Sequence, residues 1–476
     1  MTPTISTPTI STRDASSPDA SSRPTVAILD AAALGRLAGM PIGGGAASAQ
    51  TATQIRKLLA GVADARATLV DPPASPDGAR AIDHLVVADV AAETLALAAR
   101  AIDRPLLGLH SWVGHDGIWS ELIDVAPDGT RRRLIGSASM VRAHRPSRSL
   151  AVARKRSSDF VRRWFARLPD ALPAQAAGDA PPAPLNAGGL MMRTGRAATA
   201  KLFERLRRKQ QWILFADRPP HPLAPIDFAR GTPILPPPGA FWADPFPVVV
   251  DGRCHVFFEE LPFATNRGHI SVLELLPDGR TTPPVRVLER PYHLSYPFMF
   301  TWQGQWYMMP ECSENRCIEV YRCERWPDRW TLHSQQLQGQ CLADPSLVEH
   351  GGQWWMFASR RDQGITLDEE LCLFHGPTPL GPWTEHPDNP VVDDARWARP
   401  AGRPLVIDGK LFRPAQNCGR VYGESLSIRE IIELDTEHYR EREHVHLRGD
   451  SRHGMLRVHT LNMAADLRVI DAMRLI

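Results

Sequence analysis

Residues 241–260, FWADPFPVVVDGRCHVFFEE, decide the fold of this chain, because variants of this stretch recur along the sequence. The second copy, SYPFMFTWQGQWYMMPE, begins at Ser295, and the third, ADPSLVEHGGQWWMFAS, begins at Ala343. A more divergent fourth copy, GRPLVIDGKLFRPAQ, begins at Gly402. Each copy has a proline step, an apolar run, a turn containing glycine and a second run with aromatic or apolar residues. This pattern predicts a β-hairpin whose first strand begins at an X-Pro step.

The copies recur about every fifty residues, at Pro245, Pro297, Pro345 and then Pro400 or Pro404. Repeats of that length built from four strands are typical of propeller blades. Four copies occupy about 236–447, and the C-terminal stretch MLRVHTLNMAADLRVIDAMRLI supplies at least two more strands. The isolated strand WILFAD at 212–217 can complete this last blade from the N-terminal side, which leaves no open sheet edge. We therefore predict five blades.

The rest of the chain has a different texture. Residues 1–24 are rich in Ser, Thr, Pro and Asp and predict a disordered tail, whereas 25–169 alternate short apolar runs with Ala- and Leu-rich stretches of helical period. Residues 170–210 form a Pro- and Ala-rich linker and a basic helix. The fold class is therefore mainly β, with a five-bladed β-propeller at 211–476 preceded by a smaller α/β domain.

Composition excludes several classes of protein. A chain of 476 residues with 43% hydrophobic and 23% charged residues is neither fibrous nor wholly disordered. The formal charge of +2 provides no field that would draw the whole chain onto nucleic acid, and we expect no nucleic-acid partner. No run of 18 apolar residues occurs, so we expect no transmembrane segment.

The cysteines suggest the compartment. Seven cysteines at irregular spacing, without a signal peptide, predict reduced thiols and a cytoplasmic location. Cys312, Cys317 and Cys323 cluster, but their spacing is poor for zinc. We expect no metal and no cofactor.

The register of the repeat places polar residues at equivalent positions. Fifteen residues separate Asp244 from Glu259, and the same offset recurs in the next two copies. Because the innermost strands of a propeller converge on its axis, we expect one ring of side chains made by Asp244, Tyr296, Asp344, Arg399 or Arg403, and His459. A second set at the ends of the next strands contains Glu259, Glu311, Ser359 and Gln416. Such a funnel can bind a polyhydroxyl or acidic sugar, and paired carboxylates can catalyse glycosidic chemistry.

Each of these residues also has a structural interpretation. Asp244 and Asp344 can serve the turns before their prolines, and Glu311 can pair with Arg316 or Arg322. Glu259 and Glu260 include a candidate partner for Arg403 or Arg413. The three arginines Arg399, Arg403 and Arg413 either clamp a phosphate or uronate, or neutralise buried acids. His459 either orients a water or ion on the axis or is a hydrogen-bonded core histidine.

Several motifs of the chain resemble those of a known family. The steps WADP from Trp242 and LADPS from Leu342, together with PLGPWTEHPDNPVV from Pro379, resemble the five-bladed propeller glycosidases of the arabinanase, xylosidase and invertase superfamily. The resemblance implies that Asp244 is a nucleophile or general base. Two positions depart from it: Tyr296 replaces the second-blade Asp that tunes the acid, and Asp344 stands where the acid Glu is often found. Glu311 is then the remaining acid candidate.

A closer resemblance covers about 212–476. FWADPF, HVFFEE, HLSYPFMF, WYMMPE, ARPAGRP, LFRPAQNCGRVYG and HTLN are similar to the propeller that precedes the transferase domain in plant glucosamine inositolphosphorylceramide transferases. The same motifs resemble stand-alone bacterial proteins of cell-surface polysaccharide clusters, often labelled formyltransferase-like. The N-terminal RPLLGLHSWVGHDG resembles the degenerate formyltransferase-like region of those proteins. The resemblance implies a fold and a sugar context more than a reaction.

Three hypotheses follow. In the first, a carbohydrate-active enzyme performs glycosyl transfer or glycoside hydrolysis, with Asp244 attacking or activating water, Glu311 as the acid, and Asp344 with Tyr296 orienting. Substrate-binding candidates are Trp242, Tyr296, Glu259, Arg399, Arg403, Gln416 and His459. In the second, the propeller binds a glycan without catalysis and serves polysaccharide assembly machinery as a peripheral partner. In the third, the N-terminal domain transfers a formyl group to an amino sugar through His110, His115 and Asp116.

Overall fold

The computed structural model describes residues 23–43, 45–60, 68–113, 118–139, 210–361 and 366–476, together with isolated positions between 154 and 192. The chain divides into two compact units, the second of which contains all of 210–476. The predicted tail at 1–24 lies outside the described residues except for residues 23 and 24. The predicted linker and basic helix at 170–210 lie outside them except for residues 192 and 210.

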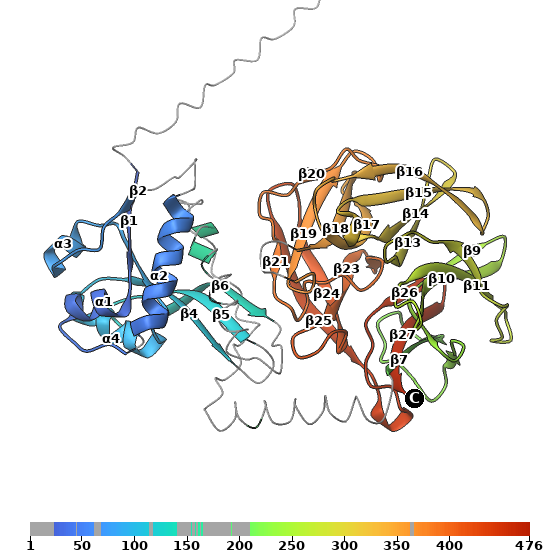
Figure 1. Ribbon diagram of the computed structural model, residues 1–476, viewed down its shortest axis with the longest axis horizontal. Coiled ribbons are helices and arrows are strands. Elements are labelled where there is room, and N and C mark those ends of the chain that lie inside the picture. Colours follow the sequence, from blue (N-terminus) through green and yellow to red (C-terminus); the bar gives the residue numbers. More distant parts are fainter. Residues whose placement is uncertain are drawn as a thin grey trace, which may run out of the picture. The chain divides into compact units, whose positions relative to one another are not determined.

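The N-terminal part of the chain forms one six-stranded sheet accompanied by helices (Figure 1). The strand order is β2-β1-β3-β4-β5-β6, and β1, β3 and β4 pair in parallel. Asp30 caps the first helix by accepting a hydrogen bond of 2.7 Å from the Ala33 amide. The predicted α/β character is confirmed. The elements are β1 Thr25–Leu29, α1 Ala31–Ala38, α2 Gly45–Ala60, β2 Thr68–Val70, α3 Pro76–Arg80, β3 His84–Ala88, α4 Ala92–Ile102, β4 Leu106–Val113, β5 Ile118–Val125 and β6 Arg131–Ser139.

The second part forms five separate antiparallel sheets, which are the five predicted propeller blades (Figure 1). Blade 1 consists of β9 Ala240–Val250, β10 Arg253–Pro262, β11 His269–Leu275 and β12 Val285–Leu288. Blade 2 consists of β13 Ser295–Trp302, β14 Gln305–Glu311, β15 Ile318–Arg325 and β16 Arg329–Gln336, with the short helix η2 Ser313–Asn315. Blade 3 consists of β17 Leu342–His350, β18 Gln353–Arg360, β19 Glu370–Gly376, β20 Thr384–Glu385 and β21 Val392–Asp393. Blade 4 consists of β22 Leu405–Ile407, β23 Lys410–Asn417, β24 Ser425–Leu434 and β25 Tyr439–Arg448.

Blade 5 closes the ring with strands from both ends of this part of the chain. Its order is β26 Leu461–Ala464, β27 Leu467–Leu475, β7 Gln210–Asp217 and β8 Thr232–Ile234, and η3 Ser451–His453 precedes it. The C-terminal β27 pairs antiparallel with β7 over eight residue pairs, from Arg468 opposite Asp217 to Leu475 opposite Gln210. The predicted closure through WILFAD is therefore confirmed. Arg468, 0% exposed, supports it with contacts of 2.8 and 2.5 Å to the Asp217 carboxylate.

The same β-bulge occurs at the start of three inner strands. In blade 1, Ala243 lies opposite Glu259 and Phe246 lies opposite Phe257, so the inner strand holds one extra residue. Blades 2 and 3 repeat this shift. Asp244, Tyr296 and Asp344 occupy the bulge and have φ of 52°, 44° and 54°. A bulge redirects a side chain, and here it does so at the end of the strand nearest the predicted site.

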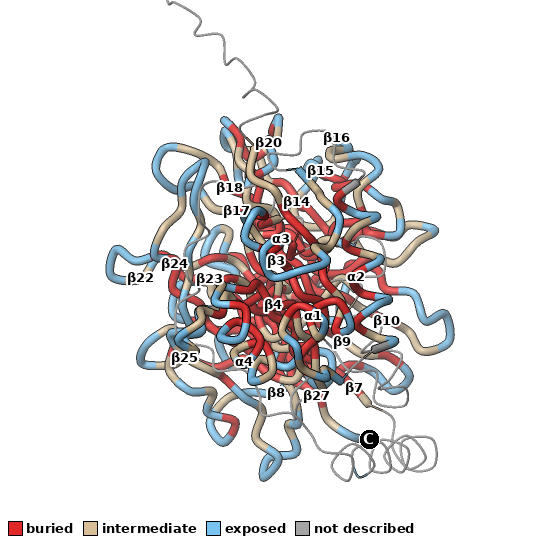
Figure 2. Tube along the Cα trace, turned by 90° about the vertical axis from the view of Figure 1, so that its left-hand side faces the viewer, coloured by how far each residue is buried: buried red, intermediate tan, exposed pale blue. Residues whose placement is uncertain are grey.

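Apolar residues of neighbouring blades form the core. One cluster joins blades 1, 2 and 3 through Phe257, Phe298 and Met356, all of them fully buried. Figure 2 shows burial concentrated on inner strands such as β14 and exposure at hairpins such as the one beside β22. Among the helices that the structure describes, none has the length and apolar character needed to cross a bilayer.

Candidate functional site

The beginnings of the inner strands surround a cavity of about 290 Å³, which we call the axial cavity. It collects charged and aromatic side chains from all parts of the propeller, including residues more than 200 positions apart in the sequence. Five predicted site residues with ionisable side chains line it: Asp244, Glu259, Glu311, Arg399 and His459. Its wall also contains Trp212, Phe241, His293 and Tyr422.

Asp244 is held rigidly at the bottom of this cavity. One carboxylate oxygen accepts a hydrogen bond of 2.7 Å from the Thr460 hydroxyl, and the other accepts one of 3.2 Å from the Tyr296 amide. The side chain is nearly buried, with 5% exposed. Burial raises the pKa of Asp244, His459 opposes that shift, and Asp471 adds to it. The two donors orient the carboxylate, and the alternative role of capping its own turn is not seen among its contacts.

His459 connects Asp244 to Asp471 at the base of the cavity. Its Nδ1 lies 2.6 Å from the Asp471 carboxylate, and its Nε2 lies 3.8 Å from Asp244 Oδ1. The imidazole stacks on Trp212 with ring centroids 4.1 Å apart. Burial would by itself lower the pKa of His459, but Asp471 and Asp244 raise it, and the net direction is upward. The imidazole therefore lies between two acidic side chains that favour its protonated form.

The group Asp244, His459 and Asp471 is also where a metal ion would find ligands, because one ligand atom from each lies within 4.8 Å of the others. Protein donors already occupy Asp471. It accepts hydrogen bonds from the amides of Asp244, His459 and Thr460, at 2.9 to 3.0 Å. A cation there would compete with these donors and with the imidazole.

Glu259 faces the cavity from the second strand of blade 1. Burial raises the pKa of this carboxyl well above its usual range, and the neighbouring Asp244 and Glu311 carboxyls add to the shift. His293 Nε2 lies 3.2 Å from Glu259 Oε1. Since His293 Nδ1 accepts a hydrogen bond of 3.0 Å from the Gly268 amide, the ring proton is on Nε2 and points to Glu259. Burial and the neighbouring carboxyls thus favour the protonated form of Glu259, and His293 fixes its orientation.

Replacing Glu259 with glutamine is expected to stabilise the protein at pH 8. The folded protein binds the Glu259 proton more tightly than the unfolded chain, so raising the pH above the unfolded pKa of about 4.3 reduces the stability of the natural protein. Glutamine removes this penalty, and we expect the melting temperature at pH 8 to rise by about 2–4 °C. The gain should shrink toward pH 4.5. Thermal unfolding followed by circular dichroism at both pH values measures it.

Glu274→Gln is the matched control. Glu274 forms a surface ion pair with Arg253, which lowers the pKa of Glu274, so this variant should gain no stability at pH 8. A Glu259→Gln protein that is less stable than the natural protein at pH 8 would show that Glu259 acts as a buried anion.

Glu311 lies across the cavity at the equivalent position of blade 2. Its Oε1 accepts a hydrogen bond of 2.9 Å from the Ser313 amide, and its Oε2 accepts one of 3.4 Å from the Ser295 hydroxyl. The predicted alternative partners bind elsewhere, because Arg316 donates to the Gly339 carbonyl and Arg322 pairs with Glu324. These two donors fix the orientation of the Glu311 carboxyl group.

Asp344 does not line the axial cavity. Arg399 binds both of its oxygens, at 2.7 and 3.3 Å, and also contacts Asp368 at 3.0 Å. Gln416, which is fully buried, donates a hydrogen bond of 3.3 Å to the same carboxylate. Burial raises the pKa of Asp344 to about 7, Arg399 opposes the shift, and Asp244 adds to it. Asp344 is thus paired with the Arg399 guanidinium. Of the two roles predicted for Arg399, its contacts match the neutralisation of a buried acid.

Three further predicted residues lie away from the axial cavity. The Tyr296 hydroxyl is buried between the Ser346 hydroxyl, at 2.7 Å, and the Gly402 amide, at 2.6 Å. Trp242 packs on Phe258 with ring centroids 4.9 Å apart, within the core between blades 1 and 5. Arg403 lines a different cavity, described below. Core residues therefore pack against Trp242, which was a substrate-binding candidate.

The predicted partnership between the blade 1 glutamates and the arginines is wrong. Arg413 binds Glu441 through two contacts of 2.6 and 2.8 Å. Glu260 instead accepts a hydrogen bond of 2.7 Å from the Ser271 hydroxyl and lies 3.3 Å from His269. These partners come from other strands of the same blades: β11 is adjacent to the β10 strand of Glu260, and β25 lies two strands from the β23 strand of Arg413.

Three residues in the wall of the axial cavity or beside it were not predicted from the sequence. Asp471 lies on the second strand of blade 5, as Glu259 does in blade 1. It follows His459 by twelve residues, whereas Glu259 follows Asp244 by fifteen. In the sequence, Asp471 is marked only as one acidic residue within the largely apolar run RVIDAM. Tyr422 and Trp212 reach the cavity from a loop and from the closing strand, and no repeat position marks them.

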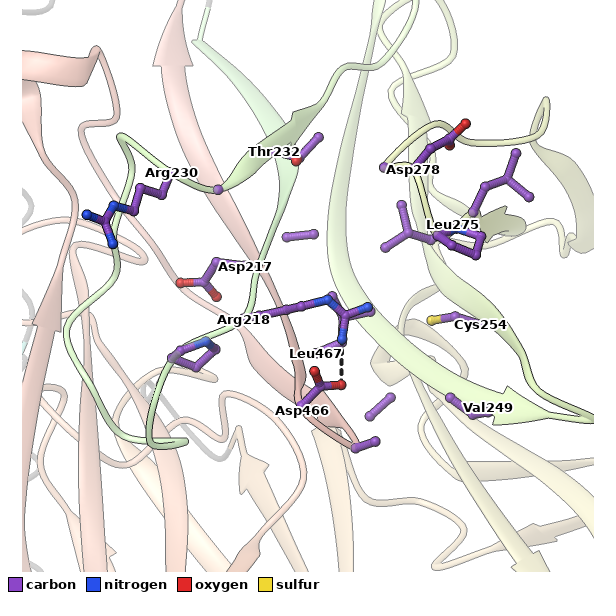
Figure 3. Close-up of a pocket in the computed structure, with 18 of the residues that line it drawn as sticks. Asp217, Arg218, Arg230, Thr232, Val249, Cys254, Leu275, Asp278, Asp466 and Leu467 are labelled. Carbon is purple, nitrogen blue, oxygen red and sulfur yellow. Dashed lines mark hydrogen bonds and ion pairs between the residues drawn. The ribbon is translucent and has the colours of Figure 1, made fainter.

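A larger cavity of about 680 Å³ lies between blades 5 and 1 (Figure 3). None of the predicted site residues lines it. Its charges are paired, as in the contact of 2.5 Å between Arg218 and Asp466 that Figure 3 marks. Burial raises the pKa of the Cys254 thiol in its wall to about 11, which keeps this thiol protonated.

The remaining predicted groups lie elsewhere. His110 is on β4 of the N-terminal sheet, whereas His115 and Asp116 lie outside the described residues. All seven cysteines lie among the described residues as free thiols.

The propeller matches a known family. Residues 232–464, from β8 to β26, match the model of the N-terminal region of glucosamine inositolphosphorylceramide transferase 1. The glucosamine inositolphosphorylceramide transferase 1 of Oryza sativa subsp. japonica is 38% identical over 208 residues, and that of Arabidopsis thaliana is 35% identical. The matches cover 43% of this chain but only 28% and 27% of those proteins. The resemblance predicted from the propeller motifs is confirmed, and the chain spans little more than a quarter of these relatives.

Solved structures with a similar arrangement are glycoside hydrolases. A family 117 glycoside hydrolase from Zobellia galactanivorans has a TM-score of 0.36 at 12% identity, covering 56% of this chain and 90% of its own. An exo-β-1,3-galactanase from Clostridium thermocellum has a TM-score of 0.34 at 12% identity, covering 45% of this chain and 50% of its own. Likeness at this level says nothing about the reaction.

Proposed function

We propose that the propeller is a carbohydrate-active module that binds a glycan or sugar conjugate in the axial cavity and performs glycoside hydrolysis or glycosyl transfer. One observation carries the proposal: Asp244, Glu259 and Glu311 line a single small cavity. Paired carboxylates in different protonation states are what glycosidic bond cleavage requires. The match to the N-terminal region of plant glucosamine inositolphosphorylceramide transferases supports a role in cell-surface polysaccharide or glycolipid metabolism.

Asp244 and Glu259 divide the chemistry. Asp244, which is oriented by Thr460 and the Tyr296 amide, accepts the proton of an attacking water or attacks the anomeric carbon itself. Glu259, whose pKa is raised well above its usual range, donates its proton to the leaving glycosidic oxygen as the carbon–oxygen bond breaks. This assignment moves the acid from Glu311 to Glu259, while Glu311 accepts hydrogen bonds from sugar hydroxyls.

Aromatic side chains complete the binding surface. Trp212, Phe241 and Tyr422 line the axial cavity, and aromatic faces pack against the apolar faces of sugar rings. Trp212 is held by its stack on His459, so its orientation is set before a ligand arrives. These residues take the role that the sequence assigned to Trp242.

Glu311→Gln tests the proposal. The purified protein is incubated with a panel of oligosaccharides, aryl glycosides and nucleotide sugars, and released or transferred sugars are detected by mass spectrometry. We expect turnover by the natural protein and a loss of about tenfold or more in the Glu311→Gln protein, because one of the two carboxyl oxygens that accept hydrogen bonds from sugar hydroxyls is replaced by an amide NH2 group. Glu274→Gln, the same change in the larger cavity of Figure 3, should keep full activity. Equal activity of all three proteins would contradict the placement of the site.

A non-catalytic glycan-binding role is the second candidate. The pairing of Asp344 favours this role, because Asp344 was the third candidate catalytic carboxylate and Arg399 neutralises it. This role predicts calorimetric binding of an oligosaccharide that Glu311→Gln weakens, with no product from any member of the panel. The cytoplasmic location and the peripheral contact with polysaccharide assembly proteins belong to the same proposal, and the seven free thiols support the location.

A further inference from the structure

A second cavity, of about 270 Å³, lies at the opposite ends of the inner strands, and we call it the distal cavity. The axial cavity is lined by the beginnings of β9 and β13, at Asp244 and Ser295, whereas the distal cavity is lined by their later residues, at Val248 and Phe300. No residue lines both cavities. The buried Tyr296, which lies in neither wall, occupies the inner strand between them.

The side chains that line the distal cavity are apolar apart from the Thr301 hydroxyl and one guanidinium. Val248, Phe300, Trp306 and Met463 provide its apolar wall, and Arg403 provides the charge. Trp306 is fixed by Trp326, with ring centroids 4.9 Å apart. An apolar, preformed cavity with a single charged group is the usual construction of a small-molecule site.

Arg403 has no carboxylate partner among the described residues. One of its nitrogens, Nη2, donates to the Met299 carbonyl, and the guanidinium lies over the Phe298 ring at 4.8 Å. Within the described part of the chain, Nε and Nη1 make no hydrogen bond. Burial lowers the pKa of Arg403 to about 10, so the group is still charged at neutral pH.

Arg403 is half-buried, as is Arg399, whereas Arg413 and Arg468 are buried. Unlike Arg403, these three other arginines of the propeller each bind a carboxylate, at 2.5 to 2.7 Å. A cation partly withdrawn from water without a counter-ion is costly, and an anion that enters the cavity would reduce that cost.

We propose that the distal cavity is a second binding site of the propeller, for an oxyanion carried on an apolar or aromatic body. The oxyanion, a carboxylate or a phosphate monoester, binds the Arg403 guanidinium. The body packs against Phe300, Trp306 and Met463. The site is separate from the carboxylate-lined axial cavity, and the two ends of the propeller axis therefore select ligands of opposite character.

Calorimetry on the full chain tests this proposal with four probes. Phenyl phosphate and benzoate carry both the oxyanion and the apolar ring, inorganic phosphate lacks the ring, and phenol lacks the charge. We expect at least one of the two complete probes to bind at least tenfold more tightly than phosphate and phenol, and the tighter of the two identifies the oxyanion. Arg403→Gln should weaken that probe at least tenfold. The proposal would be overturned if phenol bound as tightly as the complete probes. It would also be overturned if a complete probe bound the Arg403→Gln protein as tightly as the natural protein.

Ala465→Asp provides a second route that leaves Arg403 in place. Ala465 lines the distal cavity with φ of 54°, a backbone conformation that Asp and Asn adopt more readily than Ala, so both variants should fold. The aspartate supplies a competing carboxylate and should weaken the anionic probe at least tenfold, whereas Ala465→Asn, of the same shape, should not. Equal affinities of the two variants would overturn the proposal. Glu311→Gln should leave probe binding intact, which separates this site from the axial cavity.

Discussion

Asparagine in place of Asp244 should lower turnover of the glycosidic substrate by a factor of about 10² to 10⁴, the contribution of a general base. Asparagine has the same shape as aspartate and tolerates the left-handed φ of 52° at this position. It still accepts the hydrogen bond from Thr460, but it can neither take a proton from water nor attack an anomeric carbon. Initial rates on the substrate identified from the panel measure the loss.

Asp251→Asn is the matched control for this change. Asp251 lies at the other end of the same inner strand, in the hairpin turn after β9, with φ of 49° and an exposed side chain. The same chemical change in the same backbone conformation should leave the rate unaltered. Unchanged turnover in the Asp244→Asn protein would remove Asp244 from the mechanism.

Alanine in place of Gly402 should destabilise the propeller by about 3 kcal/mol or more, through backbone strain and overpacking. Gly402 has φ of 140°, a conformation restricted to glycine, and a Cβ at this position would lie 2.0 Å from the Leu461 carbonyl oxygen. The Gly402 amide also donates to Tyr296, so this residue joins the inner parts of blades 2, 4 and 5. Urea unfolding followed by tryptophan fluorescence measures the change.

Gly409→Ala provides the comparison. Gly409 also has a positive φ, of 74°, but a Cβ there meets nothing within 4 Å. Its substitution should cost only the backbone penalty of about 1–2 kcal/mol. Equal destabilisation by the two substitutions would show that the close approach of blades 4 and 5 at Gly402 contributes nothing to stability.

The repeat predicted much of the fold. The hairpins of blades 1 to 4, the fifth blade and its closure by WILFAD all follow from alternating apolar residues and glycine turns. These signals are local, because a strand pairs with the next strand through a short turn. The bulge at Asp244 was not predicted, since an extra residue in one strand changes the pairing but not the apolar pattern.

The site was predicted in part. Equivalent register correctly brought Asp244, Glu259, Glu311 and His459 to one cavity. The same reasoning offered Arg399 or Arg403 for one position of the ring; Arg399 lines the axial cavity, and Arg403 lies at the opposite end of the inner strands. Blade 4 departs from the shared bulge, so its repeat position does not report which end of the axis a side chain reaches.

The sequence by itself determined the number of blades and the closing strand, because these depend on periodicity and on turns between neighbours. Only the tertiary structure decided which ionisable groups are partnered. Arg399 neutralises Asp344 from 55 residues away, Asp471 holds His459, and Arg403 has no carboxylate partner among the described residues. Charge state and partnership depend on distances of a few ångströms between segments far apart in the chain, and on burial that only the assembled blades create.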